Sequence, residues 1–162
     1  MRTRLATLAD AEAIREIYNL EVTTSTVTFD LVPRTPAQQE EWLAKRSGAH
    51  AVIVAEDTGQ VVGFAALSPY RDRGAYATTV EDSVYVARAH QGRGIGKLLL
   101  GDLIEVARQR GFHAMMARIV GGHEASIGLH RSMGFWEVGV EREVGRKFGQ
   151  WLDVVLMQRM LS

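Results

Sequence analysis

The chain has 162 residues, of which 46% are hydrophobic, and this size and composition predict one globular domain spanning residues 1–162. Nineteen basic side chains balance nineteen acidic ones, so no net field would recruit nucleic acid or an anionic membrane. The absence of cysteine excludes disulfides, thiolate metal sites and a cysteine nucleophile. Because there is no apolar run of about 20 residues and no signal-like N-terminus, we expect a cytoplasmic protein.

The first half of the chain alternates extended and helical patterns. Thr35 and Gln38 form a capping-box pair around Pro36, which indicates where the second helix begins. Asp57-Thr58-Gly59 separates two β-branched runs and is typical of a hairpin turn. In chain order we predict a strand at 1–7, a helix capped near Thr7 and Asp10, a loop at 23–33, a helix at 36–47 and paired strands at 51–55 and 61–67.

The second half contains the longest amphipathic helix. Ile95, Leu99 and Leu103 recur along one helical face after a glycine-rich loop, and Gly111 is well placed to end that helix. In chain order we predict a loop at 69–77, a strand at 79–86, the glycine-rich loop, a helix from 95 to about 110, a strand at 114–120, a helix at 124–133 and strands at about 137–144 and 151–160 around a turn at 145–149.

The glycine-rich loop, Gln91 to Lys97, lies between the strand at 79–86 and that helix. Its three glycines let the backbone approach a ligand, and the helix opens with unpaired N–H groups aimed the same way. We therefore predict a seat for an anionic phosphate, supported by a local basic run of Arg88, His90, Arg93 and Lys97. An ordinary turn between a strand and a helix is the alternative.

Several other chemistries fit the sequence poorly. A nucleotide triphosphate loop needs a hydroxyl where Leu98 stands, and a dinucleotide loop needs a glycine where Lys97 stands. His123-Glu124 does not begin a zinc motif, since Ile127 occupies the position of the second histidine. No Gly-x-Ser-x-Gly elbow occurs. We therefore expect neither a metal site nor a serine hydrolase.

Gln91, Gly94 and Gly96 fit the pattern Gln/Arg-x-x-Gly-x-Gly/Ala, which resembles the pyrophosphate loop of the GNAT superfamily of N-acetyltransferases. The order of the predicted elements is similar to that family's over nearly the whole chain. Ser126 to Phe135 also looks like the family's Ala-x-x-Leu-Tyr-x-x-x-Gly-Phe segment, with His130 in place of the tyrosine. The resemblance implies an α/β (α+β) GNAT fold, with a single mixed, mostly antiparallel sheet of about seven strands flanked by about four helices.

Several blocks resemble one subfamily more closely, the phosphinothricin and methionine sulfoximine acetyltransferases. These blocks are residues 17–19, 28–30, 81–86, 129–130 and 147–154. The resemblance implies acetyl-CoA as the cosubstrate and a small-molecule amine as the acceptor. It also implies a direct attack of the amine on the thioester.

The resemblance and the loop chemistry together indicate the coenzyme contacts. Backbone N–H groups from Gly92 to Lys97 would hold the diphosphate, and the strand at 84–86 would pair with the pantetheine amide as if with another strand. Solvated surface charge is the alternative for the Arg93 and Lys97 side chains. The expected coenzyme residues are Val84, Tyr85, Val86, Gln91, Gly92, Arg93, Gly94, Ile95, Gly96, Lys97, His123 and Ser126.

Acyl transfer to an ammonium group needs a base, and a carboxylate in the strand before the loop could accept the proton directly or through water. Glu81 is the candidate, because the resembled subfamily has its proposed base there, and Asp82 is the fallback. His130 could protonate the departing thiolate or pair with the base. A solvated charge for Glu81 and a packing role for His130 are the alternatives.

The acceptor site is predicted from the loop before that strand. Arg71 and Arg73 could clamp a carboxylate. The other expected substrate residues are Phe29, Gly74, Ala75 and Tyr76. A mobile surface loop with no binding role is the alternative.

Rival interpretations differ in acceptor or in class. The protein could instead acetylate a peptide N-terminus, a polyamine or an aminoglycoside. Arg71 and Arg73 disfavour these acceptors, because the two arginines would repel a cationic acceptor. A non-catalytic acyl-CoA-binding module and a purely structural domain are further alternatives. We expect no nucleic acid or membrane partner, and a homodimer.

Overall fold

One seven-stranded sheet organises the chain, with the strand order β1-β2-β3-β4-β5-β7-β6. The computed structural model describes all 162 residues. The strands are β1 (Arg2–Leu5), β2 (Val52–Asp57), β3 (Gln60–Pro69), β4 (Thr79–Val86), β5 (Ala114–Val120), β6 (Trp136–Lys147) and β7 (Gln150–Met160). The helices are α1 (Ala11–Thr24), α2 (Pro36–Ala44), α3 (Ile95–Gln109) and α4 (Glu124–Ser132), with short 3-10 turns at Leu8–Asp10, Gly74–Tyr76 and Arg88–His90.

All predicted helices and strands are present, with corrections at some ends. Helix α2 has the predicted capping box, in which Thr35 Oγ1 accepts from Gln38 N and Gln38 Oε1 accepts from Thr35 N. The predicted turn at 145–149 is too long, because β6 continues to Lys147. Only Phe148 and Gly149 turn the chain, and both adopt positive φ, the geometry of a two-residue hairpin turn.

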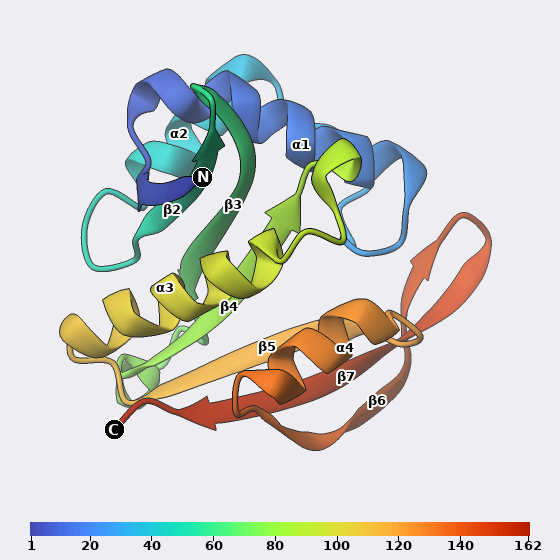
Figure 1. Cartoon of the computed structure of the whole chain (residues 1–162). Helices are drawn as coiled ribbons and strands as arrows, with labels where there is room; N and C mark the ends of the chain where they lie inside the picture. The colour runs from blue at the N-terminus through green and yellow to red at the C-terminus, as the bar shows by residue number, and fades with distance from the viewer.

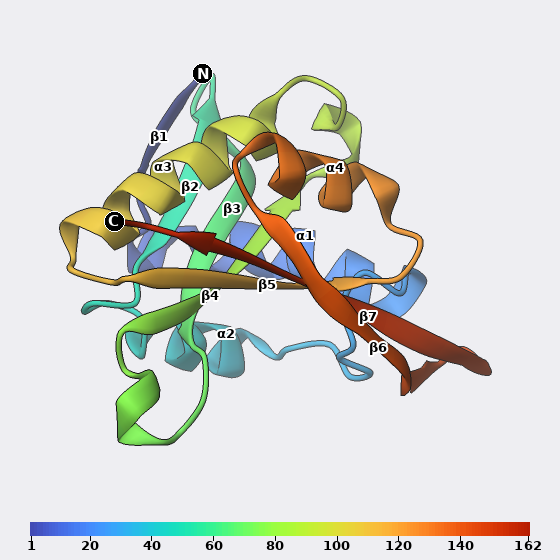
Figure 2. The same cartoon turned by 90° about the horizontal axis from the view of Figure 1, so that it is seen from below.

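The helices cover the two faces of the sheet separately. Helices α3 and α4 lie on one face and α1 and α2 on the other (Figures 1 and 2). The α3 face holds the larger core, in which Leu99, Leu100 and Leu103 are fully buried. The α1 face holds a smaller core around Ile14, Val54 and other buried side chains. Burying each such side chain contributes about 1.5–3 kcal/mol, which anchors the helices that border the functional site.

Strands β4 and β5 diverge from each other in the middle of the sheet. They form the only parallel pair, and their register covers Thr79 to Glu81 opposite Ala114 to Met116. Beyond Glu81, β4 pairs only with β3, whereas β5 pairs along its whole length with β7. Figure 1 shows the resulting gap between the two halves of the sheet. The β4 edge facing this gap therefore has backbone N–H and C=O groups without a ladder partner.

Candidate active site

A cleft of about 840 Å³ occupies the gap between β4 and β5. Residues of α1, β4, β5 and α4 form its walls, and the glycine loop with the first turn of α3 closes one end. A volume of this size is typical of a site that holds a small molecule or cofactor.

The glycine loop has the conformation that an anion seat requires. Gly92 and Gly94 adopt φ values of 77° and 81°, a left-handed region that residues with a side chain rarely adopt. Gly94 is the N-cap of α3, so the unpaired N–H groups of the first helical turn follow directly. A Cβ atom at Gly96 would lie 3.4 Å from Leu129 and 3.9 Å from Val86, in ordinary van der Waals contact with two residues that line the cleft, so only a side chain larger than that of alanine would crowd this end.

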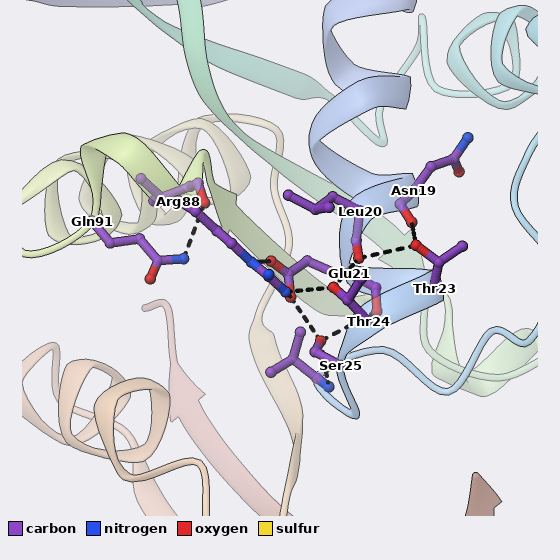
Figure 3. Close-up of polar contacts among 10 residues, drawn as sticks. Asn19, Leu20, Glu21, Thr23, Thr24, Ser25, Arg88 and Gln91 are labelled. Atoms are coloured by element: carbon purple, nitrogen blue, oxygen red, sulfur yellow. Dashed lines mark hydrogen bonds and ion pairs between the residues drawn. The ribbon is translucent and has the colours of Figure 1, made fainter. Parts of the chain in front are cut away.

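The side chains of the basic run near this loop differ in whether they form ion pairs. Arg88 forms an ion pair with Glu21, with Nε 3.0 Å from Oε1, and its Nη2 donates to Thr24 Oγ1 at 2.6 Å. Figure 3 shows Arg88 extended toward the end of α1, where Ser25 also donates to Glu21. Arg93 points away toward Asp57, at 3.6 Å. Lys97 lines the cleft and forms no ion pair, so it is the cation of this run with its charge free.

Glu81 and Asp82 lie on opposite faces of the sheet because strand residues alternate. Val80, Asp82 and Val84 face α3 and α4, since Val80 and Val84 belong to the core on that side. Glu81 faces the α1 side together with Tyr85, whose ring packs in the other core. The cleft lies between the strands and is therefore open to both carboxylates.

Burial raises the pKa of Glu81 above its usual value of 4.5. The Arg118 guanidinium opposes this effect and the Asp82 carboxylate adds to it. A carboxylate with a raised pKa is a stronger base than one in water, which suits it to accept a proton from an ammonium group.

His130 and Asp82 form a buried pair on the opposite face of the sheet from Glu81. His130 Nε2 lies 3.0 and 3.1 Å from the two Asp82 carboxylate oxygens, and Nδ1 lies 2.8 Å from the Ser126 carbonyl oxygen. A carbonyl only accepts, so Nδ1 carries a proton, and an ionised Asp82 requires a second proton on Nε2. Burial disfavours the charged ring, but Asp82 and the Ser126 carbonyl outweigh it and raise the pKa of His130.

Most of the predicted site residues come together in this cleft. Those that line it are Phe29, Glu81, Val84, Tyr85, Val86, Gln91, Gly92, Gly94, Ile95, Gly96, Lys97, His123, Ser126 and His130. His123 is half-buried, and burial lowers its pKa although Glu21 opposes the shift. His130 pairs with Asp82 rather than with the candidate base Glu81.

Six predicted residues lie outside the cleft lining, namely Arg93 and the acceptor-loop residues Arg71, Arg73, Gly74, Ala75 and Tyr76. Figure 2 shows this loop at the end of β4 opposite to the glycine loop. The Arg71 guanidinium lies 5.0 Å from the Tyr70 ring centre and 5.9 Å from that of Tyr76. The loop arginines therefore do not reach the cleft of the same chain in this structure.

Sequence reasoning missed two charged residues that line the cleft, Glu21 and Arg118. Arg118 is the one charged residue in the strand sequence Ala-Met-Met-Ala-Arg-Ile-Val, and that isolation was a usable signal. Glu21 gave a weaker signal: it lies three residues after Tyr18 on the buried face of α1, but a single carboxylate near a helix end is usually solvated.

No group of three or more histidine, aspartate or glutamate side chains is arranged to hold a metal ion. No helix has both the length and the apolar character needed to span a membrane.

A diverging strand pair that ends at an anion-binding glycine loop, with carboxylates beside the gap, defines an enzyme site for an extended, phosphate-bearing donor. Residues 12–135 match the model of the acetyltransferase (GNAT) family, and the chain belongs to this family. The predicted enzyme class, an N-acetyltransferase, is confirmed.

Relatives cover nearly the whole chain. It is 41% identical to the L-methionine sulfoximine/L-methionine sulfone acetyltransferase of Salmonella typhimurium, over 100% of this chain and 95% of that protein. A phosphinothricin acetyltransferase from Sinorhizobium meliloti, solved in complex with acetyl-CoA, has a TM-score of 0.96 at 39% identity, over 99% of this chain and 88% of that one. A ribosomal-protein-alanine N-acetyltransferase from Brucella melitensis has a TM-score of 0.97 at 42% identity, over 99% of both chains. The predicted GNAT fold is confirmed.

Proposed function

We propose that this chain, as a single domain over residues 1–162, transfers an acetyl group from acetyl-CoA to the α-amine of a small amino acid. Methionine sulfoximine, methionine sulfone and phosphinothricin are the acceptors suggested by the names of its relatives. The observation that carries the proposal is the unpaired edge of β4, which runs from Asp82 to the glycine loop along one wall of the cleft.

The residues present fit the coenzyme chemically. The N–H groups between Gly92 and Lys97 would bind the diphosphate, and the open space around Gly92 and Gly94 leaves room for it. The free ammonium of Lys97 would add charge at the same end. The unpaired β4 edge at residues 84–86 offers N–H and C=O groups to an extended amide chain. Acetyl-CoA supplies the thioester, and the protein needs no covalent intermediate.

Protons would move on both faces of the sheet. Glu81 would accept a proton from the acceptor ammonium, directly or through water, and so free the amine for attack. His130, held charged by Asp82, would pass its Nε2 proton to the departing thiolate from the α4 side and keep the Nδ1 proton in its hydrogen bond to the Ser126 carbonyl; the neutral ring would then regain a proton from solvent. The two groups lie on opposite faces of the sheet, so base and acid do not neutralise each other.

A steady-state assay tests this function. Purified protein would be given acetyl-CoA with methionine sulfoximine, methionine sulfone, phosphinothricin or ordinary amino acids. We expect saturable acetylation of at least one of these amino acids. Binding of acetyl-CoA without turnover of any amine would contradict the enzymatic proposal and favour a binding module.

A second acceptor class, a peptide N-terminus, is favoured by the similarity to the Brucella melitensis enzyme named for ribosomal protein alanine. The same assay distinguishes it when it includes a short peptide that begins with alanine. A higher kcat/KM for the peptide than for every free amino acid would select this second function.

The chain is also proposed to act as a homodimer. Edge strand β6 exposes Trp136, Val138 and Val140, with 48%, 51% and 38% of each residue accessible, and such an apolar edge is costly in water. Light scattering after size-exclusion chromatography should give twice the mass of 17.9 kDa. The monomer mass at all concentrations would contradict this assembly.

A further inference from the structure

One arginine, Arg118, lines the cleft near Glu81 and belongs to none of the sequence motifs described above. Arg118 projects from β5 and lines the cleft, whereas the loop arginines 71 and 73 do not. Among the other cations lining it, Arg88 is paired with Glu21 and Lys97 lies at the glycine loop. Arg118 is therefore the cation available to an acceptor near Glu81.

The strand register places Arg118 on the same face of the sheet as Glu81. Glu81 is the neighbour of Met116, and neighbouring residues of paired strands share a face. Arg118 lies two residues beyond Met116, so alternation returns its side chain to that face. The electrostatic effect of Arg118 on the pKa of Glu81 is consistent with this proximity.

The Arg118 guanidinium has unused hydrogen-bonding capacity. Its one side-chain partner is Glu141 on β6, with Nη2 2.7 Å from Oε1. An arginine has five N–H donors in a planar fork that suits a carboxylate, and the Arg118 side chain is still 35% exposed. The Glu141 side chain is also 35% exposed, so this ion pair is weak enough to rearrange.

We propose that Arg118 binds the α-carboxylate of the acceptor amino acid while Glu81 faces its α-ammonium. The ammonium and the carboxylate of an α-amino acid are attached to one carbon. Arg118 lies on the same face of the sheet as Glu81 and two residues beyond Met116, the strand neighbour of Glu81, so one acceptor would contact both long side chains across the cleft. In the absence of an acceptor, Glu141 accepts a hydrogen bond from one of the Arg118 guanidinium nitrogens. This inference rests on the proposed amino-acid acetylation and names the group that selects the acceptor class.

Paired ligands provide the test. L-methionine sulfone and L-methionine sulfone carboxamide differ only at the carboxyl group, and each would be titrated by calorimetry into protein saturated with coenzyme A. We expect Arg118→Met to weaken methionine sulfone binding by about 10- to 100-fold, the range for a charged hydrogen bond, and to change carboxamide binding little. The compared quantity is the ratio of wild type to variant, in which the different amine pKa values of the two ligands cancel.

Three further variants sharpen the result. Arg118→Lys keeps the charge but loses the fork and should recover only part of the affinity. Glu141→Gln frees Arg118 and should tighten methionine sulfone binding by up to about fivefold. Arg142→Met is the matched control, because it removes an exposed cation from the ion pair with Asp153 outside the cleft lining. It should leave the preference for the carboxylate unchanged.

Two outcomes would overturn the inference. Equal loss of both ligands in Arg118→Met, with coenzyme A affinity and melting temperature intact, would show that the carboxylate is not the group bound. Loss of the carboxylate preference in Arg73→Met, with its retention in Arg118→Met, would return this role to the loop. The proposed function is tested separately. It is contradicted if no amine is acetylated, and the calorimetric titration measures ligand binding whether or not acetylation occurs.

Discussion

Glu81 and Asp82 are adjacent in the chain, yet the pleat of β4 directs them to different chemical partners. Glu81 faces the side of Arg118, whereas Asp82 holds His130. A single strand can therefore supply a base on one face of the sheet and support an acid on the other.

Replacing Glu81 tests the proposed base. In Glu81→Gln, kcat at pH 7 should fall by about 10²- to 10⁴-fold, the contribution of a positioned general base, with acetyl-CoA affinity unchanged. The base acts when deprotonated, so wild-type kcat/KM should decline as pH falls through the raised pKa of Glu81, above 4.5. This acidic limb should be absent from the pH–rate profile of the variant. If the acidic limb of the pH–rate profile were unchanged in Glu81→Gln, the titrating group would be a residue other than Glu81.

Asp82→Asn tests the buried ion pair. The folded pKa of His130 is raised above 6.5, so the pair contributes stability below pH 6.5 and loses it as pH rises through the raised value. The variant should be less stable than wild type by roughly 1–3 kcal/mol near pH 6, and the difference should shrink by pH 9.

The same variant should lower the pKa of His130, which NMR titration of the His130 ring measures directly. It should also move the alkaline limb of kcat to lower pH. His130→Gln is the control and should abolish that limb. A His130 pKa unaffected by Asp82→Asn would show that the two side chains are not coupled.

At the scale of elements, the Glu21–Arg88 pair connects the end of α1 to the 3-10 turn before the glycine loop (Figure 3). The Glu21 side chain is 10% exposed, and Ser25 Oγ donates to it at 2.7 Å. This network joins a wall of the cleft to the proposed coenzyme seat, so it should affect both stability and coenzyme affinity.

A double-mutant cycle measures this connection. Arg88→Met leaves the Glu21 carboxylate without its cationic partner, so it should destabilise the protein more than Glu21→Gln does. The double variant should be less destabilised than the sum of the two single variants, as urea denaturation would show. Additive effects would mean that the ion pair contributes nothing to the fold.

At the scale of the whole molecule, two halves of the sheet meet through a short parallel register. Only the segment 79–81 of β4 pairs with β5, and the cleft begins where that pairing ends. A ligand that contacts β4, the glycine loop and α4 together would therefore hold the halves in one arrangement.

Acetyl-CoA should consequently stabilise the protein. At a concentration 100 times Kd the expected gain is about 2.7 kcal/mol, which corresponds to a rise in Tm of roughly 5–10 °C. Differential scanning fluorimetry measures this shift. Gly96→Val should reduce it, because the added methyl groups would project toward Leu129 and Val86 at the coenzyme end of the cleft. An equal shift in wild type and Gly96→Val would argue that the coenzyme binds elsewhere.

Local features of the sequence determined the elements and one end of the site. The capping box at Thr35 and Gln38, the helical period after Ile95 and the glycines from 92 to 96 each act within a few residues. The element order and the position of Glu81 in its strand follow from such patterns and from the family resemblance.

Only the tertiary structure decided which distant side chains meet. His130 and Asp82 are 48 residues apart and Arg88 and Glu21 are 67 apart, while Arg71 and Arg73 prove to lie away from the cleft. Arg118 shares a face with Glu81 only because β5 pairs with β4 in one particular parallel register. Periodicity assigns a residue to a face of its own strand, but the contacts across the cleft depend on how the chain returns to that strand.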